Sequence, residues 1–227
     1  MTTVVLVRHG LTAMTGPVLA GWTPGVHLDE RGQAQAGAVA ERLRPVRFDA
    51  LVSSPLDRCL DTAATIADGR DQEVQVEQDL GECRYGEWTG RPLKELAKEP
   101  LWKVVQAHPS AAVFPGGEAL ADTQHRAVSA VRAWNAKLGE SATWLACSHG
   151  DVIKAVVADA LGLHLDQFQR IVIDPCSVTV IRYTQTRPFV VRVNDTGGGV
   201  SDLLPPTSSR RRKKDSSDAV VGGGSGA

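Results

Sequence analysis

The sequence lacks the features that mark membrane proteins, secreted proteins and nucleic-acid-binding proteins. No apolar run approaches the length of a membrane span, so no membrane association is expected. Met1 leads through Thr2 and Thr3 straight into an apolar run, without the basic start of a secretory signal peptide. The formal net charge of −1 offers no general attraction to nucleic acid.

Cysteine is scarce and widely spaced. The four cysteines, Cys59, Cys83, Cys147 and Cys176, include no Cys-x-x-Cys pair. This spacing argues against a zinc ribbon and against a disulfide framework. We therefore expect reduced thiols and a cytoplasmic protein.

Apolar runs typical of strands alternate with helical patterns along the 227 residues. The predicted strands are Val4–Val7, Phe48–Ser53, Val74–Val76, Thr143–Cys147, Val178–Tyr183 and Val190–Val193. Helices are predicted from Asp29 to Arg44, from Pro55 to before Gly69, between Gly117 and Gly139, and from Val152 to Leu161. Strands that alternate with helices predict an α/β fold, a three-layer α/β/α sandwich around a mostly parallel sheet. Only 184–188 separates the last two strands, which predicts an antiparallel hairpin at one edge.

Two segments depart from this alternation. Residues from about 91 to 117 carry leucine, valine and tryptophan, and we expect a small helical cap over the carboxyl edge of the sheet. The predicted catalytic domain is 1–196, and 197–227 is predicted to be a flexible Gly/Ser-rich tail with the basic run Arg210–Lys214. Five of the 25 basic residues but only two of the 26 acidic residues follow Leu204. The folded body is therefore mildly acidic, and no nucleic-acid partner is expected.

Chemically distinctive residues stand where an α/β sheet would bring them to one edge. Arg8 and His9 follow the first apolar run, and His149 follows the fourth. Arg58 falls on the first turn of a predicted helix, where exposed N–H groups favour an anion. Glu82 lies in a glycine-punctuated loop. Because open α/β sheets hold ligands at the carboxyl ends of their strands, these side chains form a candidate site for phosphoryl chemistry.

Six motifs in order resemble the histidine phosphatase superfamily, which includes the phosphoglycerate mutases. The resemblance extends from Thr2 to about Asn194. Its motifs are Arg-His-Gly-x-Thr at Arg8–Thr12, Gly-Trp…Leu-x-x-x-Gly-x-x-Gln-Ala at Gly21–Ala36, Ser-Ser-Pro-Leu-x-Arg-Cys-x-x-Thr-Ala at Ser53–Ala63, Leu-x-Glu-x-x-x-Gly-x-Trp-x-Gly at Leu80–Gly90, Pro-Gly-Gly-Glu at Pro115–Glu118 and Ser-His-Gly at Ser148–Gly150. Each motif alone is weak, but six in the family's order make coincidence very improbable.

The resemblance implies a role for each of these side chains. His9 would attack phosphorus and carry a phosphohistidine intermediate. Arg8, Arg58 and His149 would surround the phosphoryl oxygens, since charge-assisted bonds suit a transferring phosphoryl group. Glu82 would protonate the leaving alkoxide and then deprotonate the attacking water. These cations already supply positive charge, so no metal and no cofactor are expected.

Two positions fit the family pattern less well than the others. Many relatives carry an asparagine a few residues after Arg-His-Gly, where Thr15 stands here. A hydroxyl has one donor where an amide has two, so Thr15 as a phosphate ligand predicts weaker phosphate binding or a different substrate. Glu87 shares the loop of Glu82 and is an alternative acid, although the Leu-x-Glu alignment favours Glu82.

The six motifs are compatible with three functions. The mutases have a longer central insertion with a consecutive arginine pair, whereas Arg91–Pro115 is short and has no Arg-Arg. This difference favours a metal-independent phosphomonoester hydrolase acting on a small phosphorylated metabolite. A phosphoglycerate mutase-type phosphomutase is the alternative, and a non-catalytic relative that binds phosphorylated ligands is the lesser one. The sequence leaves a homo-oligomer open.

Overall fold

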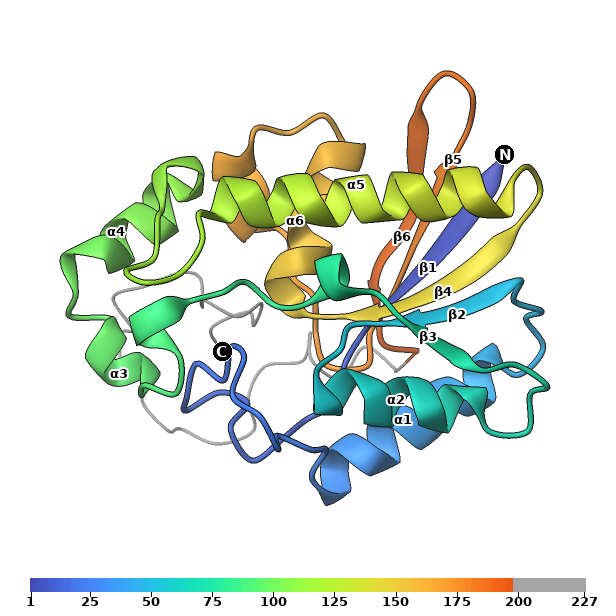
Figure 1. Cartoon of the computed structure of the whole chain (residues 1–227), viewed down its shortest axis with the longest axis horizontal. Helices are drawn as coiled ribbons and strands as arrows, with labels where there is room; N and C mark the ends of the chain where they lie inside the picture. The colour runs from blue at the N-terminus through green and yellow to red at the C-terminus, as the bar shows by residue number, and fades with distance from the viewer. Residues whose placement is uncertain (198–227) are drawn as a thin grey trace, which may run out of the picture.

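A single six-stranded sheet organises residues 1–197, the part of the chain that the computed structural model describes (Figure 1). Its strand order is β3-β2-β4-β1-β5-β6. The strands are β1 (Thr2–Arg8), β2 (Ala50–Ser53), β3 (Val74–Val76), β4 (Thr143–Ser148), β5 (Val178–Tyr183) and β6 (Pro188–Asp195). The longer helices are α1 (Glu30–Leu43), α2 (Asp57–Ala67), α4 (Pro100–Ala107), α5 (Leu120–Leu138) and α6 (Gly150–Ala160).

The sheet is mixed but mostly parallel. β4 pairs in parallel with both β1 and β2, and β2 pairs in parallel with β3. β5 runs antiparallel to β1, and β6 runs antiparallel to β5. The predicted hairpin at one edge and the predicted α/β fold class are therefore confirmed.

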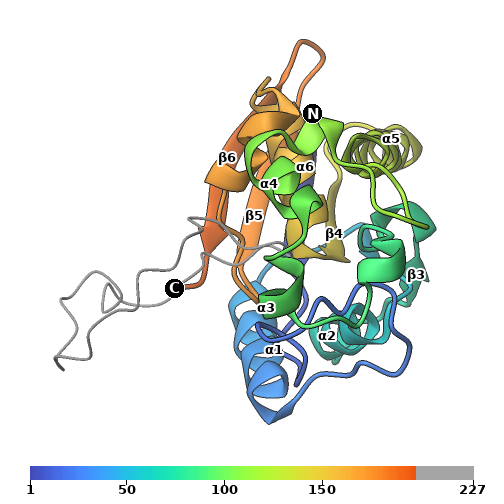
Figure 2. The ribbon, with the colours of Figure 1, turned by 90° about the vertical axis from the view of Figure 1, so that its left-hand side faces the viewer.

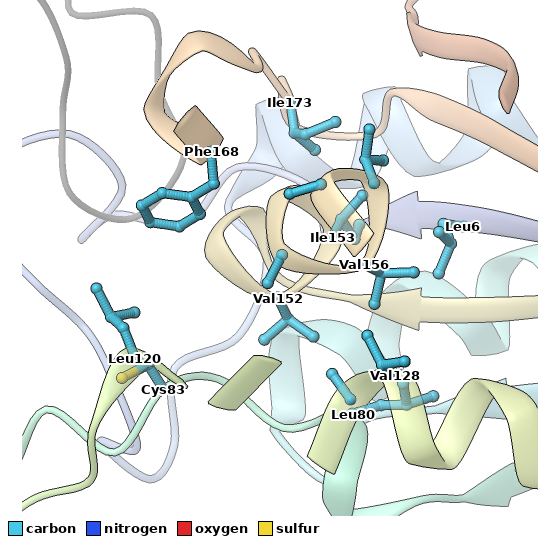
Figure 3. Close-up of a cluster of buried hydrophobic side chains, with 14 of the residues drawn as sticks. Leu6, Leu80, Cys83, Leu120, Val128, Val152, Ile153, Val156, Phe168 and Ile173 are labelled. Atoms are coloured by element: carbon cyan, nitrogen blue, oxygen red, sulfur yellow. The ribbon is translucent and has the colours of Figure 1, made fainter. Parts of the chain in front are cut away.

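Helices cover both faces of the sheet (Figures 1 and 2). Along β1, Val4 and Leu6 belong to the hydrophobic cluster that contains residues of α5 and α6. Val5 and Val7 point to the other face and join the cluster with α1 and α2. A strand buried on both faces reads as a continuous apolar run, which is why the sequence of β1 lacks polar alternation. Figure 3 shows Val156 of α6 in one buried cluster with Leu6 of β1 and Val128 of α5.

Helix boundaries follow local capping chemistry. The Asp29 side chain accepts a hydrogen bond of 2.8 Å from the N–H of Gly32 and begins α1 as predicted. Gly162, with a φ of +68°, follows the end of α6, also as predicted. The prediction that Pro55 lies in the first turn of α2 is wrong, because that helix begins at Asp57.

The close approach of α1 to the loop after β1 depends on two glycines. A Cβ at Gly10 would stand 2.7 Å from the carbonyl oxygen of Gly32. A Cβ at Gly32 would stand 2.0 Å from the carbonyl oxygen of Leu11. Both positions therefore require glycine for α1 to pack beside the end of β1.

The expected helical cap consists of α4, the short helix α3 (Leu93–Leu96) and a single 3-10 turn, η3 (Pro109–Ala111). Both helices lie on the side of the sheet toward which the carboxyl end of β1 points (Figure 1). Leu96, Trp102 and Val105 are buried in the same hydrophobic cluster as α5 and α6. The cap is thus packed on the main core.

The predicted tail falls almost entirely on 198–227, outside the described residues. Within the described part, 1–197, no helix combines the length and apolar character needed to cross a membrane.

Candidate active site

The register of β1 and β4 brings two histidines side by side. Arg8 is paired with Ser148, the last residues of β1 and β4, and each histidine is the residue directly after its strand. The imidazole centroids of His9 and His149 are 5.2 Å apart. Both side chains are buried, so the carboxyl edge of the sheet holds them in fixed relative positions.

Hydrogen bonds define the tautomer of His9. Its Nδ1 lies 2.8 Å from the carbonyl oxygen of Gly10, and because that oxygen can only accept, Nδ1 carries the proton. The Nε2 of the neutral ring then presents its lone pair, and Arg58 Nε donates to it at 3.3 Å. Burial, together with the cations Arg58 and Arg8, holds the pKa of His9 well below its usual value. The imidazole is therefore neutral near pH 7, as a nucleophile must be.

Two buried arginines, Arg58 and Arg8, contribute positive charge at His9. Arg58 Nη2 donates to the carbonyl of Gly21 at 2.8 Å and to His149 Nδ1 at 3.2 Å. Arg8 Nη1 donates to the carbonyl of Ile173 at 2.7 Å. Within the described residues, Arg58 Nη1 and Arg8 Nε have no hydrogen-bond partner. Buried donors are rarely left unpaired, so these two indicate a place for an anion.

Hydrogen bonds at both ring nitrogens orient the imidazole of His149. Because a guanidinium only donates, Nδ1 accepts from Arg58 and the proton resides on Nε2. Nε2 then donates to Ser54 Oγ at 2.7 Å. Burial first, and then the nearby cation of Arg58, keep the pKa of His149 well below its usual value.

Glu82 lies beside this histidine. Its Oε2 is 3.8 Å from His149 Nδ1, and its Oε1 accepts from the N–H of Cys83 at 3.1 Å. Burial, and then the carboxylate of Asp151, raise the pKa of Glu82 to about 7, against the opposing effect of Arg58. A carboxyl with this pKa can donate and accept protons near neutrality.

Asp151 belongs to a buried polar network next to Glu82. Its Oδ2 accepts from Tyr85 Oη at 2.7 Å, and its Oδ1 lies 3.9 Å from Lys154 Nζ. Lys154 also donates to Gln169 Oε1 at 3.0 Å. All of the side chains of Tyr85, Asp151 and Lys154 are almost fully buried.

The structure brings together five of the six residues predicted from the sequence: Arg8, His9, Arg58, Glu82 and His149. The sixth, Thr15, stays a prediction as a phosphate ligand. Its hydroxyl lies 3.0 Å from Thr12 Oγ1 and accepts from the Thr12 N–H at 3.1 Å. Glu87, the alternative acid, is exposed.

Sequence reasoning missed Ser54, Asp151 and Arg126, whose guanidinium donates to the backbone oxygen of Glu82 at 2.9 Å. Ser54 is the second residue of the motif Ser53–Ala63, and Asp151 directly follows the motif Ser148–Gly150, so their positions were a usable signal. Arg126 lies 44 residues from Glu82, and no local pattern links them.

Candidate metal ligands were sought among histidine, cysteine, aspartate and glutamate. Across residues 1–197, no group of three or more of these side chains could hold a metal ion. The cofactor expectation stays a prediction.

Comparisons with known proteins agree with this geometry. The family model of the histidine phosphatase superfamily, branch 1, matches residues 4–196. Phosphoserine phosphatase 1 of Hydrogenobacter thermophilus is 30% identical over 207 residues, covering 86% of this chain and 93% of that protein. A probable phosphoglycerate mutase of Erwinia tasmaniensis is also 30% identical, covering 89% and 95%.

Among solved structures, a phosphoserine phosphatase mutant of Entamoeba histolytica in complex with phosphoserine superposes with a TM-score of 0.78. It is 27% identical, and the match covers 86% of this chain and 98% of that one. On the match to residues 4–196 and the two relatives at 30% identity, this chain belongs to the histidine phosphatase superfamily, branch 1.

Proposed function

We propose that this protein hydrolyses phosphomonoesters of small metabolites through a phosphohistidine formed on His9. The observation that carries the proposal is the state of His9: a neutral ring whose Nε2 lone pair faces Arg58. Two buried guanidinium groups next to it have N–H donors without a partner among residues 1–197. A nucleophile beside unpaired cationic donors suits the attack on a phosphoryl group.

In the first step, His9 Nε2 forms a bond to phosphorus while the bond from phosphorus to the ester oxygen breaks. Arg8 and Arg58 stabilise the charge on the three remaining oxygens. His149 would join them with a proton on Nδ1, the nitrogen that lies 3.2 Å from Arg58 Nη2. The departing oxygen takes the proton from Glu82, whose pKa of about 7 leaves the carboxyl substantially protonated near neutrality. The alcohol then leaves.

The second step consumes water. The carboxylate of Glu82 takes a proton from a water molecule as its oxygen attacks phosphorus and the bond to His9 Nε2 breaks. Inorganic phosphate leaves, and both His9 and Glu82 return to their starting protonation states. No further reactant is needed.

A mutase is the second candidate, because one relative is named a probable phosphoglycerate mutase. Both activities share the phosphohistidine and differ in the acceptor of the phosphoryl group. Supplying 3-phosphoglycerate and separating the products distinguishes them. Phosphate release supports the hydrolase, whereas formation of an isomeric phosphoglycerate without phosphate release supports the mutase.

The comparisons with known proteins also suggest which phosphomonoesters to test as substrates. A similar structure was solved with phosphoserine, so small phosphorylated metabolites with a polar leaving group are the first to test. A panel of phosphoserine, phosphoglycerates, sugar phosphates and nucleotides, ranked by kcat/KM, identifies the preferred one. If no phosphate is released from any of these or from p-nitrophenyl phosphate, the hydrolase proposal fails.

We also propose a cytoplasmic location, which the four free, buried cysteines support.

The pH dependence follows from the neighbours of Glu82. Because the first step needs Glu82 protonated, activity toward alkyl phosphates is expected to fall as pH rises through about 7. Replacing Asp151 by asparagine keeps an acceptor for Tyr85 but removes the negative charge that raises the pKa of Glu82. The descending limb of kcat against pH should therefore move to lower pH.

The matched control for this change is Asp159→Asn, also in α6, where Asp159 Oδ2 pairs with Arg132 at 3.0 Å on the surface. That variant should leave the limb in place. A limb that stays fixed in Asp151→Asn, or that moves equally in both variants, would show that Asp151 does not set the protonation of Glu82.

We further propose that residues 1–196 form the catalytic domain, with the cap at about 91–117. Every proposed site residue lies at or before His149, and the sequence after Leu204 is rich in Gly, Ser and charge. Truncation after Leu204 is expected to leave kcat and KM for p-nitrophenyl phosphate within about twofold. Loss of activity or solubility in the truncated protein would contradict this domain assignment.

A further inference from the structure

Arg126, in α5, holds the loop that carries Glu82. Its Nη1 donates to the backbone oxygens of Asp79 at 2.7 Å and Gly81 at 2.8 Å. Its Nη2 donates to the backbone oxygen of Glu82 itself at 2.9 Å. One side chain thus binds three carbonyls within four consecutive residues of the loop.

The two remaining N–H bonds of Arg126 go to Glu118. Nε donates to Oε2 at 3.1 Å and Nη2 donates to Oε1 at 2.6 Å, a bidentate ion pair. Glu118 Oε1 also accepts from the N–H of Arg84 at 2.7 Å. The pair therefore binds the chain on both sides of Glu82, and all five donors of the guanidinium are used.

This arrangement is not an ordinary surface ion pair. The side chains of Arg126 and Glu118 are only 15% and 14% exposed. The loop between β3 and α3 has only the single turns η1 (Gln78–Leu80) and η2 (Gly86–Trp88) as regular structure. Side-chain donors therefore help to hold its backbone near Glu82. Besides Arg126, Trp22 Nε1 donates to the Glu82 oxygen at 2.6 Å and Ser148 Oγ donates to the Leu80 oxygen at 2.7 Å.

We propose that Arg126, oriented by Glu118, is a positioning residue that fixes the carboxyl of Glu82 where it exchanges a proton with the leaving group. The inference rests on the proposed function, in which Glu82 is the acid. The hydrogen bonds of Arg126 go to the loop backbone and to Glu118, so its contacts reach the site through Glu82. Its positive charge also lowers the pKa of His149, an effect that Arg126→Lys retains. A displacement of about 1 Å in a reacting group can cost on the order of 100-fold in rate.

The test compares two substrates that differ in their need for an acid. An alkyl phosphate such as phosphoserine releases a poor leaving group, whereas p-nitrophenyl phosphate needs little protonation. Arg126→Met should lower kcat for the alkyl ester by about 10-fold to 100-fold, with a clearly smaller loss for p-nitrophenyl phosphate. KM should change little, because Arg8, Arg58 and His149 are untouched. Arg126→Lys, which keeps the charge but not the planar fork, should restore part of the loss.

Arg132→Met is the matched control, because Arg132 lies in the same helix and pairs with Asp159 at the surface. It should leave the ratio of the two kcat values unchanged. The decisive comparison repeats Arg126→Met in a Glu82→Gln background. If Arg126 acts through Glu82, the selective loss disappears there, because the proton to be positioned is already gone.

Equal losses of kcat/KM, which reports the steps up to release of the alcohol, for both substrates in Arg126→Met would overturn the proposal. A selective loss that persists without Glu82 would overturn it too. A Tm measured for each variant identifies loss of fold, and where Arg126→Met does not fold, Arg126→Lys and Glu118→Gln carry the same comparison. A wild-type protein that releases phosphate from neither ester would instead refute the proposed function. In that case a crystal structure of the variant still decides the positioning role, which fails if Glu82 keeps its place.

Discussion

His9→Ala is expected to abolish phosphate release from every substrate, by on the order of 10⁴-fold or more in kcat. His9 is the group proposed to bond to phosphorus, and alanine has no nucleophilic atom. The side chain lies at the end of β1 rather than in a hydrophobic cluster, so its loss should leave the fold and the Tm close to those of the wild type. Steady-state kinetics with p-nitrophenyl phosphate and circular dichroism measure the two effects.

The matched control is His27→Ala. The imidazole of His27 is 62% exposed and pairs with Asp61 at the surface, so its removal should leave kcat unchanged. A covalent test is available as well: rapid acid-free quenching should trap a phosphorylated wild-type protein and none of the His9→Ala variant. Substantial turnover by a folded His9→Ala protein would disprove the mechanism.

Glu82→Gln is expected to have the second largest effect, and one that depends on the leaving group. Glutamine keeps the shape of the side chain and an oxygen that can accept from the Cys83 N–H, but it has no transferable proton. Alkyl phosphates should lose about 10²-fold to 10⁴-fold in kcat, the usual contribution of general acid–base catalysis. p-Nitrophenyl phosphate should lose less in its first step, because its leaving group is stable as an anion.

Glu87→Gln supplies the control within the same loop, since Glu87 is exposed and is expected to contribute nothing to the rate. The measurement is kcat for both esters in both variants. Because both esters share the hydrolysis of phosphohistidine, kcat/KM, which reports the steps up to release of the alcohol, is compared as well. If Glu82→Gln lowers kcat/KM equally for both esters, Glu82 orients the substrate rather than supplying a proton. If Glu87→Gln instead shows the selective loss, the acid has been assigned to the wrong residue.

Much of the fold could be predicted from local patterns. The run Val4–Val7 is apolar at every position because β1 is covered on both faces, and continuous apolar runs between helical segments are typical of such strands. Asp29 and Gly162 mark helix ends by chemistry that operates within a few residues. The start of α2 was predicted wrongly from Pro55, because proline suits both the first turn of a helix and the turn before a helix.

Three members of the candidate site were predictable because they stand at strand ends. Arg8, His9 and His149 stand at the ends of β1 and β4, and adjacent parallel strands in register bring such residues together. Thr15 lies in the loop after β1 rather than at a strand end, and its hydroxyl accepts from the Thr12 N–H. Its role as a phosphate ligand stays a prediction.

The sequence by itself determined the order of the strands and helices, the family and the residue types at the sheet edge, because these depend on short-range periodicity and on motifs. Tertiary structure decided the protonation states of those residues. The tautomer of His9 depends on the carbonyl of Gly10, and the pKa of Glu82 depends on burial and on Asp151, 69 positions away in the chain. Desolvation and charge–charge interactions act through space, so they arise only when folding has placed distant groups together.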